Sequence, residues 1–450
     1  MRLALPVLAE QLLTMLVGFT DWWLTGQYLE EASFQAAMGL MAYTLWLLPS
    51  LFAAPAIGAR ALVARSVGSN NLLDARRITH QALFIGMLIA VGVTVATAIG
   101  GRTYVAAMHL TGDAADHAAR YLAILVPVIP AIMVEQIGIA CLQGAGDTVS
   151  GFFARTIVNL INITVSATLV IGIGSVDRLG WEGLAIGTAC GHGVGGLIVL
   201  GLLLKGRAGL RLRCLSLRPR RQAIGRLLKV GLPGGTDTLV VVGCHLVYVT
   251  IINRLGTLAA AAHGLGVTIE SISYLPGSAF QVAAATLAGQ HLGAASPQRA
   301  VHSILMATLA GAVLLTGAGI LFYFCPESLT AFFTGSADNP TAVITSSLLQ
   351  IVALSMPFLA VLMILTGGLH GAGDTRWTLA ITLTGFLLVR LPLACLLAWE
   401  QVPIPFLGIE IEGWNLGVQG AWYAMLADVI LRSLLTTTRF WHGGWTQIRV

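Results

Sequence analysis

The chain is a succession of long apolar segments separated by short polar breaks. Each segment has about 20 residues, the length that an α-helix needs to cross the ~30 Å hydrocarbon core of a membrane. The segments do not alternate between apolar and polar residues at every second position, as the strands of a membrane barrel would. The pattern therefore predicts an all-α polytopic membrane protein with about twelve transmembrane helices. They are expected over residues 5–26, 34–58, 80–100, 119–142, 152–173, 182–204, 230–253, 259–287, 301–324, 343–368, 378–399 and 417–438.

A basic stretch separates the first six segments from the last six. Residues 205–229 contain nine Lys and Arg residues, and positive charge beside apolar spans is retained on the cytoplasmic side of a membrane. Most other Arg residues, Arg155 and Arg432 among them, fall in connections on this same side, so both termini are expected to be cytoplasmic. The expected organisation is an N-terminal lobe over 1–204, a cytoplasmic linker over 205–229 and a C-terminal lobe over 230–450.

The two halves also repeat each other. The motif Leu142-Gln-Gly-Ala-Gly-Asp-Thr148 recurs as Leu369-His-Gly-Ala-Gly-Asp-Thr375, and the same spacing separates Pro130 from Pro357. Because each half holds an even number of spans, both have the same topology. The repeat axis is therefore expected to run along the membrane normal, as in transporters that open alternately to either side.

The repeated GAGDT motif resembles a phosphate-binding loop but lacks the GxxxxGK[ST] pattern and follows no strand. We interpret it as a tight cytoplasmic turn in which a glycine adopts a positive φ. Asp147 and Asp374 are then expected to cap the helices that follow.

Composition supports a membrane location and excludes several functions. Hydrophobic residues make up 56% of the chain and charged residues 10%, whereas a soluble domain is roughly one quarter charged. The net charge of +5 comes largely from the basic stretch, so we expect the lipid bilayer and no nucleic acid as partner. The six cysteines have neither disulfide nor metal-site spacing. No P-loop and no pairing of a nucleophile with a base is evident, so neither ATP-driven pumping nor an enzyme is expected.

Several stretches together resemble the multidrug and toxic compound extrusion (MATE) family. They are VGFTDWWLTG in the first span, the two GAGDT turns, AAHGLGVTIESISYLPGSAF with GQHLGA, LLVRLPL, and RFWHGGW near the end. The resemblance covers nearly the whole chain. It implies a V-shaped pair of six-helix bundles in the bacterial inner membrane, acting as a monomer without a cofactor. Its implied function is the export of cationic, amphipathic small molecules in exchange for protons or sodium ions.

The resemblance also implies a coupling site in the first lobe. In some bacterial members this site uses an Asp of the first span, an Asn and an Asp in the fifth, and a Thr in the sixth. Asp21, Asn162 and Thr188 occupy three of these positions, and Ser166 stands where the second carboxylate would be. Asp21, Asn162 and Thr188 thus form a possible sodium site.

Further ionisable residues lie within the spans, where each costs roughly 2.5–3.5 kcal/mol unless it faces a cavity or a partner. Glu135 either supplies the carboxylate that Ser166 lacks or bonds to a neighbouring helix, while Glu10 lies closer to the cytoplasm and is expected to be solvated. Glu270, Arg390 and Asp428 are at similar depths and are expected to form one network with a surplus negative charge. This network could bind a proton, a sodium ion or a cationic substrate, or could clamp three helices together.

The leading hypothesis is a secondary multidrug antiporter driven by protons or sodium ions. A flippase for lipid-linked precursors, from the same superfamily, is the first alternative. It would favour a strongly cationic cleft, whereas the central charges of this sequence lean acidic. A membrane-embedded enzyme is the alternative from a different class.

Overall fold

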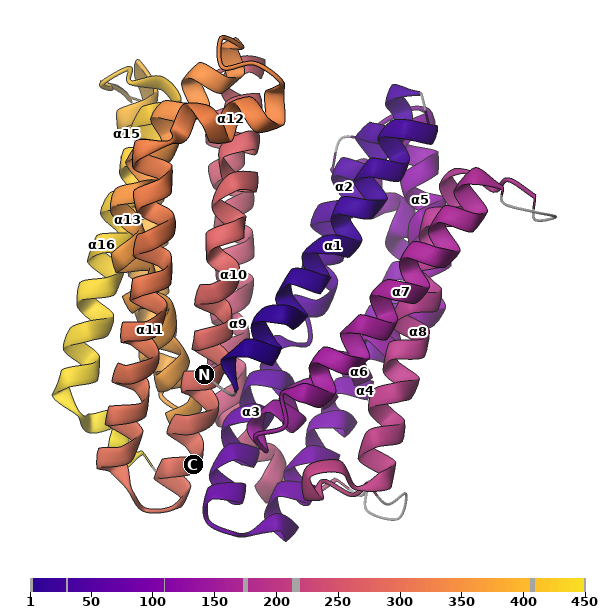
Figure 1. Ribbon diagram of the computed structural model, residues 1–450, viewed down its shortest axis with the longest axis vertical. Coiled ribbons are helices and arrows are strands. Elements are labelled where there is room, and N and C mark those ends of the chain that lie inside the picture. The colour runs from indigo at the N-terminus through magenta and orange to yellow at the C-terminus, as the bar shows by residue number, and fades with distance from the viewer. Residues whose placement is uncertain are drawn as a thin grey trace. The chain divides into compact units, whose positions relative to one another are not determined.

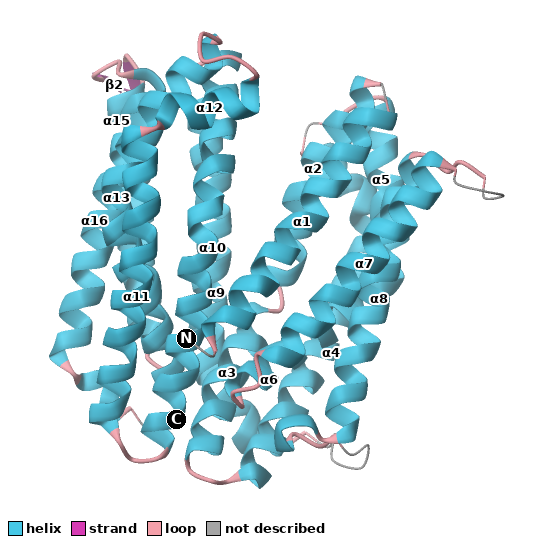
Figure 2. Ribbon diagram, viewed as in Figure 1, coloured by secondary structure: helices cyan, strands magenta, loops and turns pink. Residues whose placement is uncertain are grey.

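The computed structural model describes residues 3–29, 31–108, 110–172, 177–212, 219–404 and 409–448. These residues are almost entirely helical, as Figure 2 shows. They form two compact units, the first ending at Gly235 and the second beginning at Thr236; we term them the first and the second lobe. Residues 213–218 of the expected linker lie outside the described residues. The boundary between the lobes falls inside helix α9 (Arg221–Asn253).

The first lobe is built from long helices (Figure 1). Their core includes Leu24, Phe52 and Tyr121. Helix α7 packs against both α1 and α8, and these three helices carry the residues of the expected coupling site. Its helices are α1 (Ala4–Tyr28), α2 (Ala32–Ser50), α3 (Ala53–Gly68), α4 (Leu72–Ala107), α5 (Asp113–Leu125), α6 (Ile129–Gly144), α7 (Val149–Ile171) and α8 (Trp181–Lys205).

Proline interrupts two of the predicted spans of this lobe. The span expected over 34–58 is divided between Pro49 and Pro55 into α2 and α3, which meet at an angle of 42°. The span expected over 119–142 is divided by a 3₁₀ turn, η1 (Val126–Val128), with Pro127 inside it and Pro130 just after it. Proline lacks the backbone N–H that would continue the helical hydrogen bonds, so each break lies at the residue type that causes it.

The second lobe has the same order of long helices and a core of its own that includes Leu369 and Phe440. Two of its elements were not predicted, the short helix α12 and a β-hairpin of β1 (Gln401–Ile404) and β2 (Ile409–Glu412). Besides most of α9, its helices are α10 (Thr257–Gly293), α11 (Pro297–Phe324), α12 (Pro326–Thr334), α13 (Pro340–Ala372), α14 (Thr375–Leu383), α15 (Leu391–Ala398) and α16 (Gly417–His442).

The predicted membrane spans are present. Nine described helices or joined helices are long and apolar enough to cross a membrane, and the bent pair α2 and α3 adds one more. Helices α10 and α16, of 37 and 26 residues, fall at the two remaining predicted positions. The prediction of an all-α polytopic membrane protein built as two six-helix bundles is confirmed.

The two GAGDT motifs form the same tight turn in both lobes. Gly146 and Gly373 have φ values of 89° and 88°, a conformation that glycine adopts without steric cost. Gly144 and Gly371 let helices approach closely: a Cβ on Gly144 would lie 2.6 Å from the carbonyl oxygen of Arg60, and one on Gly371 would overlap that of Ala285. The motif therefore has a structural role in each lobe.

The aspartates of these turns bind arginines near the end of the last helix of their lobe. Asp147 pairs with Arg207 at 2.6 Å and accepts a hydrogen bond from the backbone N–H of Ser150 at 3.1 Å, as a helix cap does. Burial acts to raise the pKa of Asp147, but the hydrogen bonds from Arg207 and Ser150 outweigh it and hold the pKa below its usual value. Within the described part of the chain, Asp374 makes no capping hydrogen bond and instead pairs with Arg439 at 2.7 Å, so the capping prediction is correct only for Asp147.

Candidate functional site

Asp21, Asn162 and Thr188 meet inside the first lobe. The Thr188 hydroxyl lies 3.4 Å from Asp21 Oδ2 and accepts a hydrogen bond from Asn162 Nδ2 at 3.1 Å. Tyr121 of α5 joins them through a 3.0 Å hydrogen bond between its hydroxyl and that of Thr188. All four side chains are buried, with Asp21 only 1% exposed. We term these residues, with the adjoining Ser166, the Asp21 cluster.

Glycines on α8 bring α7 close enough to form this cluster. A Cβ on Gly187 would overlap the Ser166 hydroxyl, and one on Gly191 would lie 2.9 Å from the carbonyl oxygen of Val158. Asn162 and Ser166 are four residues apart on α7 and therefore lie on one face of that helix. The close approach of the two backbones places this face directly against Thr188.

The cluster carries one negative charge and several oxygen atoms without a protein partner. Asp21 Oδ1, Asn162 Oδ1 and Ser166 Oγ are buried and make no hydrogen bond to the described residues. Buried oxygen atoms of this kind normally bind water or an ion. Since no cationic side chain pairs with Asp21 among the described residues, its charge can be neutralised by a proton or by a bound cation.

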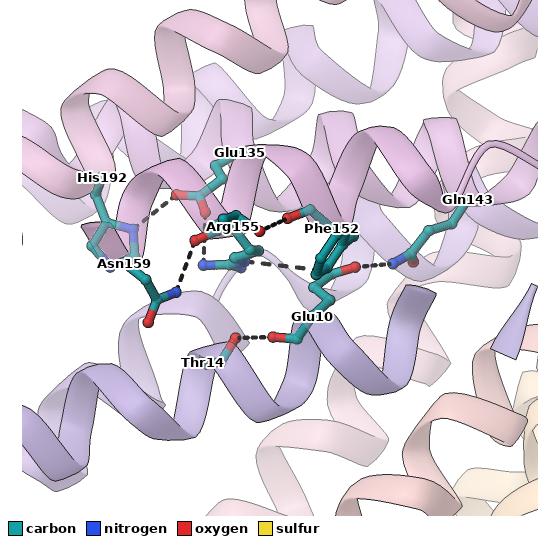
Figure 3. A network of polar contacts seen from close by, with 9 residues as sticks. Glu10, Thr14, Glu135, Gln143, Phe152, Arg155, Asn159 and His192 are labelled. Atoms are coloured by element: carbon teal, nitrogen blue, oxygen red, sulfur yellow. Dashed lines mark hydrogen bonds and ion pairs between the residues drawn. The ribbon is translucent and has the colours of Figure 1, made fainter. Parts of the chain in front are cut away.

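Glu135 is bonded to neighbouring helices rather than to this cluster (Figure 3). Its Oε1 lies 2.6 Å from Arg155 Nη1, and its Oε2 lies 2.8 Å from His192 Nδ1. Ser166 has no hydrogen-bond partner in the described part of the chain, so Glu135 does not supply the carboxylate missing there. Of the two readings of Glu135, bonding to a neighbouring helix is the one observed.

Glu10 differs from its predicted environment. It is 7% exposed, accepts a hydrogen bond from Gln143 Nε2 at 3.3 Å and lies 3.9 Å from Arg155 Nε. The expectation of a solvated Glu10 is therefore wrong. Arg155, assigned from the sequence to a cytoplasmic connection, is in fact 8% exposed and bound to carboxylates.

In the second lobe, Asp428 binds two arginines. Its Oδ2 lies 2.8 Å from Arg390 Nε, and Arg432 donates to both of its oxygens at 2.5 and 2.7 Å. Both guanidinium groups also stack on the ring of Phe386, at 4.6 and 4.5 Å from its centre. Asp428 is fully buried, and we term these four residues the Asp428 cluster.

The local backbone is adapted to this cluster. Residues Thr384–Arg390 form a π-helical segment, in which the N–H of Leu391 donates to the carbonyl of Phe386 five residues earlier. Gly385 lies against Asp428 and Arg432, where a Cβ would overlap both side chains. Such π-helical segments often occur at functional sites.

Glu270 does not join the cluster directly. It is half-buried and has no ion pair or hydrogen bond of its side chain within the described ranges, although it lies within electrostatic reach of Arg390. The predicted meeting of Glu270, Arg390 and Asp428 is therefore correct for the last two residues alone. The predicted surplus of negative charge is wrong, because Arg432 makes the four ionisable groups neutral in sum.

Among the participants missed in the sequence, the two arginines had a detectable signal and Tyr121 had none. Asp428 and Arg432 are four residues apart on one helix, the spacing of an ion pair. Arg155 and Asn159 have that spacing too, and continue the face of α7 that carries Asn162. Tyr121 lies near the outer end of the fourth predicted span, but nothing in the sequence indicates its contact with Thr188. No group of three or more His, Cys, Asp or Glu residues able to hold a metal is found among the residues described.

Comparisons with known proteins agree on one family. The sequence model of the MatE family matches residues 6–168 and 235–396, one range for the most part in each lobe. The "Probable multidrug resistance protein NorM" of Thermotoga maritima is 27% identical, over 99% of this chain and 92% of the relative. The "Multidrug resistance protein MdtK" of Pectobacterium atrosepticum is 25% identical, over 97% and 93% of the two chains.

Solved structures show the same fold. A MOP superfamily transporter from Pyrococcus furiosus, described as having a binding pocket of reverse polarity, matches with a TM-score of 0.88 and 17% identity, over 100% of this chain and 96% of that one. A MATE crystal structure in the bent conformation matches with a TM-score of 0.86 and 18% identity, over 98% and 95% of the chains.

Proposed function

The chain belongs to the MatE family of multidrug efflux transporters, and we propose that it exports cationic, amphipathic small molecules in exchange for protons or sodium ions that bind at Asp21. It is thus a multi-pass membrane transporter and not an enzyme. Placement in the bacterial inner membrane, with both termini in the cytoplasm and function as a monomer, is part of the proposal.

The observation that carries the proposal is the isolation of the Asp21 carboxylate. Oδ2 lies 3.4 Å from a single hydroxyl, and Oδ1 has no partner among the described residues. A buried charge without a partner is costly, so a proton or a sodium ion that neutralises it binds favourably. Asn162, Ser166 and Thr188 supply neutral oxygen atoms next to it, which suit either a hydrated proton or a sodium ion.

Ser166 limits the charge that this site can exchange. With one carboxylate in the cluster, a single monovalent cation restores neutrality. We therefore propose that the Asp21 cluster exchanges one positive charge in each transport cycle.

The test is gradient-driven uptake of the fluorescent organic cation ethidium by proteoliposomes containing the full chain. We expect Asp21→Asn to reduce uptake to the background of empty liposomes, because the amide keeps the shape but carries no charge for a proton or a sodium ion to neutralise. Asp113→Asn, an identical change at an exposed position of the same lobe, should leave uptake unchanged. Undiminished uptake in Asp21→Asn at equal reconstitution would rule the proposal out.

The same liposomes distinguish the two ions. An imposed pH gradient and an imposed sodium gradient are applied separately, and the gradient that drives uptake identifies the coupling ion. A Ser166→Asp variant adds a second carboxylate to the cluster, so its transport should require an additional cation and become steeper in the concentration of the coupling ion.

A flippase for anionic lipid-linked precursors is the alternative, and the Asp428 cluster is the observation that favours it. Two buried arginines share one aspartate there, which leaves a local positive charge that an anionic headgroup could use. This alternative predicts no ethidium transport and a loss of lipid translocation in Arg390→Gln.

A further inference from the structure

The first lobe contains a second group of buried charges, separate from the Asp21 cluster (Figure 3). At its centre is the fully buried carboxylate of Glu135 on α6, held between Arg155 of α7 at 2.6 Å and His192 of α8 at 2.8 Å. His192 is the most accessible of the three, with 16% of its side chain exposed. Any exchange of protons with the surroundings therefore begins at His192.

Arg155 lies between two carboxylates. Its Nη1 contacts Glu135, and its Nε is 3.9 Å from Glu10 Oε1 and makes no hydrogen bond to the described residues. Glu10 in turn accepts from Gln143 and lies within electrostatic reach of Arg60 of α3. The Arg155 guanidinium thus contacts Glu135 directly, and it would have to move only a short distance to contact Glu10 as closely.

The charges of this network are balanced only while His192 is neutral. Glu10 and Glu135 then oppose Arg60 and Arg155, and protonation of His192 adds one positive charge in a buried place.

The titratable neighbours of His192 are Glu135 from α6 and Arg155 from α7. On α5, Tyr121 bonds to Thr188, which lies one turn before His192, and Cys190 and Glu182 lie on α8 itself.

Two glycines provide room for the carboxylates. A Cβ on Gly195 of α8 would lie 3.3 Å from the Glu135 carboxyl carbon, and one on Gly151 of α7 would lie 3.0 Å from Glu10 Oε2. The backbones of α7 and α8 therefore pack close to the two acids, and because glycine has no side chain, no Cβ occupies the space beside either carboxylate.

The network and the Asp21 cluster lie along one face of α7. Arg155, Asn159, Asn162 and Ser166 are all buried and are spaced by four, three and four residues, the spacing of a single helix face. They span about 16 Å at 1.5 Å per residue. Asn159 Oδ1, Asn162 Oδ1, Ser166 Oγ and Asp21 Oδ1 make no hydrogen bond to the described protein, and buried atoms of this kind are normally hydrated.

We propose that His192 is a second proton-binding group of the first lobe, which acts on the Glu135–Arg155–Glu10 network and communicates with Asp21 along the hydrated face of α7. The proposal rests on the proposed function in so far as Asp21 is the coupling site. Water gives a proton to the imidazole, and the resulting imidazolium competes with Arg155 for Glu135. Arg155 then moves toward Glu10, which changes the contacts of α7 with α1, and loss of the proton reverses each step.

Direct titration of His192 is the first test. We use pH-difference infrared spectra of the full chain in lipid, without substrate or gradient, and subtract the spectra of His192→Gln. We expect a protonation step that is present in the wild-type spectra and absent from those of His192→Gln. The step should persist in Asp21→Asn, which separates this inference from the role of Asp21. Absence of any step assigned to His192 would overturn the proposal.

The pH profile of transport is the second test. Ethidium uptake is measured at a series of pH values under a gradient of constant size, using whichever ion drives the wild type. We expect the wild-type rate to vary about tenfold across the series and that of His192→Gln to vary less than about twofold. The amide of the variant can still donate to Glu135, so the fold should be kept. His302→Gln, at an exposed position of α11, is the matched control and should retain the wild-type profile.

Glu10→Gln tests the movement of Arg155. It removes the second carboxylate, so we expect a flat transport profile although His192 still titrates in the infrared spectra. A wild-type profile in either His192→Gln or Glu10→Gln would show that the network is a structural clamp. Loss of transport in Asp21→Asn together with such a profile would leave the proposed function standing and refute this inference alone.

Discussion

Three fully or almost fully buried carboxylates differ in the partners that their side chains have. Glu135 and Asp428 each bind an arginine at hydrogen-bonding distance, whereas Asp21 is bound only by a hydroxyl in the described part of the structure. The charge of a paired carboxylate is already balanced within the protein. The proposed coupling role of Asp21 rests on the absence of such a pair among the described residues, since an unpaired carboxylate is neutralised by a proton or a cation from solution.

Removal of one charge from the Asp428 cluster is expected to destabilise the second lobe. Asp428→Asn leaves two buried guanidinium groups without a carboxylate, which should lower the free energy of unfolding by about 3–5 kcal/mol. Glu270→Gln changes a half-buried group that has no ion pair with the described residues, and should leave the unfolding free energy within about 0.5 kcal/mol. The measurement is an unfolding titration in detergent, with ethidium transport per folded molecule alongside.

The two variants also decide the role of each group. Lost transport with normal stability in Glu270→Gln would make Glu270 part of the transport machinery. An Asp428→Asn protein that unfolds like the wild type would contradict the clamp that the contacts indicate.

At the residue scale, the sequence predicted the depth of some buried residues and few of their side-chain partners. Asp21, Asn162 and Thr188 were identified through family resemblance, and Arg390 and Asp428 through their similar depth. Arg155 and Arg432 were missed as members of the sites because the positive-inside rule assigns an arginine near a span end to the cytoplasm. In the structure, both lie far enough inside their helices to reach a buried acid. Which way a side chain faces depends on helix rotation, which no single segment encodes.

At the scale of elements, apolar length predicted the helices and proline predicted where they break. The predicted spans fall on the observed helices, most of which run several residues further at one or both ends. Polar residues such as those at the start of α4 and α9 continue the helix beyond the apolar core. Helix α12 and the hairpin β1–β2 were missed, since each is too short to produce a periodic signal. The hairpin has alternating residues in Ile409–Glu412, which in retrospect is the pattern of a strand.

Close packing between α10 and α13 depends on Gly367. A Cβ there would lie 2.7 Å from Gln281 Cγ and would overlap the Gln281 carbonyl oxygen, so Gly367→Ala should force the helices apart. We expect a loss of about 1–3 kcal/mol in unfolding free energy, the usual cost of overpacking. Gly317→Ala is the matched control, because nothing lies within 4 Å of a Cβ on that residue of α11. The control should be unchanged or more stable by up to about 1 kcal/mol. Equal stability of the two variants in the same titration would contradict the packing argument.

At the scale of the whole molecule, the chain is two copies of one helical unit. The repeated turns share their glycine geometry, and each has its aspartate bound to an arginine near the end of its lobe's last helix. The family model likewise matches twice along the chain. The buried sites do not repeat: the first lobe has an isolated aspartate and a histidine network, and the second has two arginines on one aspartate. The common fold is thus set by turns and glycines, while the chemistry of each lobe is set by a few buried side chains.

Successive spans cross the membrane in opposite directions, so successive connections are expected on opposite sides of it. Because both lobes have the same topology, equivalent connections of the two lobes are expected on the same side. The connections after α3 and α10, next to the GAGDT turns and the arginine-rich ends, are expected in the cytoplasm. The connections after α7 and α12 carry little positive charge and are expected outside.

Cysteines introduced singly at Ser69, Gln298, Asp177 and Asp338, all exposed, report these four connections in a chain whose native cysteines have been replaced. A membrane-impermeant maleimide added to intact cells should label Asp177→Cys and Asp338→Cys. It should label Ser69→Cys and Gln298→Cys only after permeabilisation. An inverted first lobe would exchange the labelling of Ser69→Cys and Asp177→Cys, and an inverted second lobe would exchange that of Gln298→Cys and Asp338→Cys. The pattern therefore tests the shared topology of the lobes as well as their orientation.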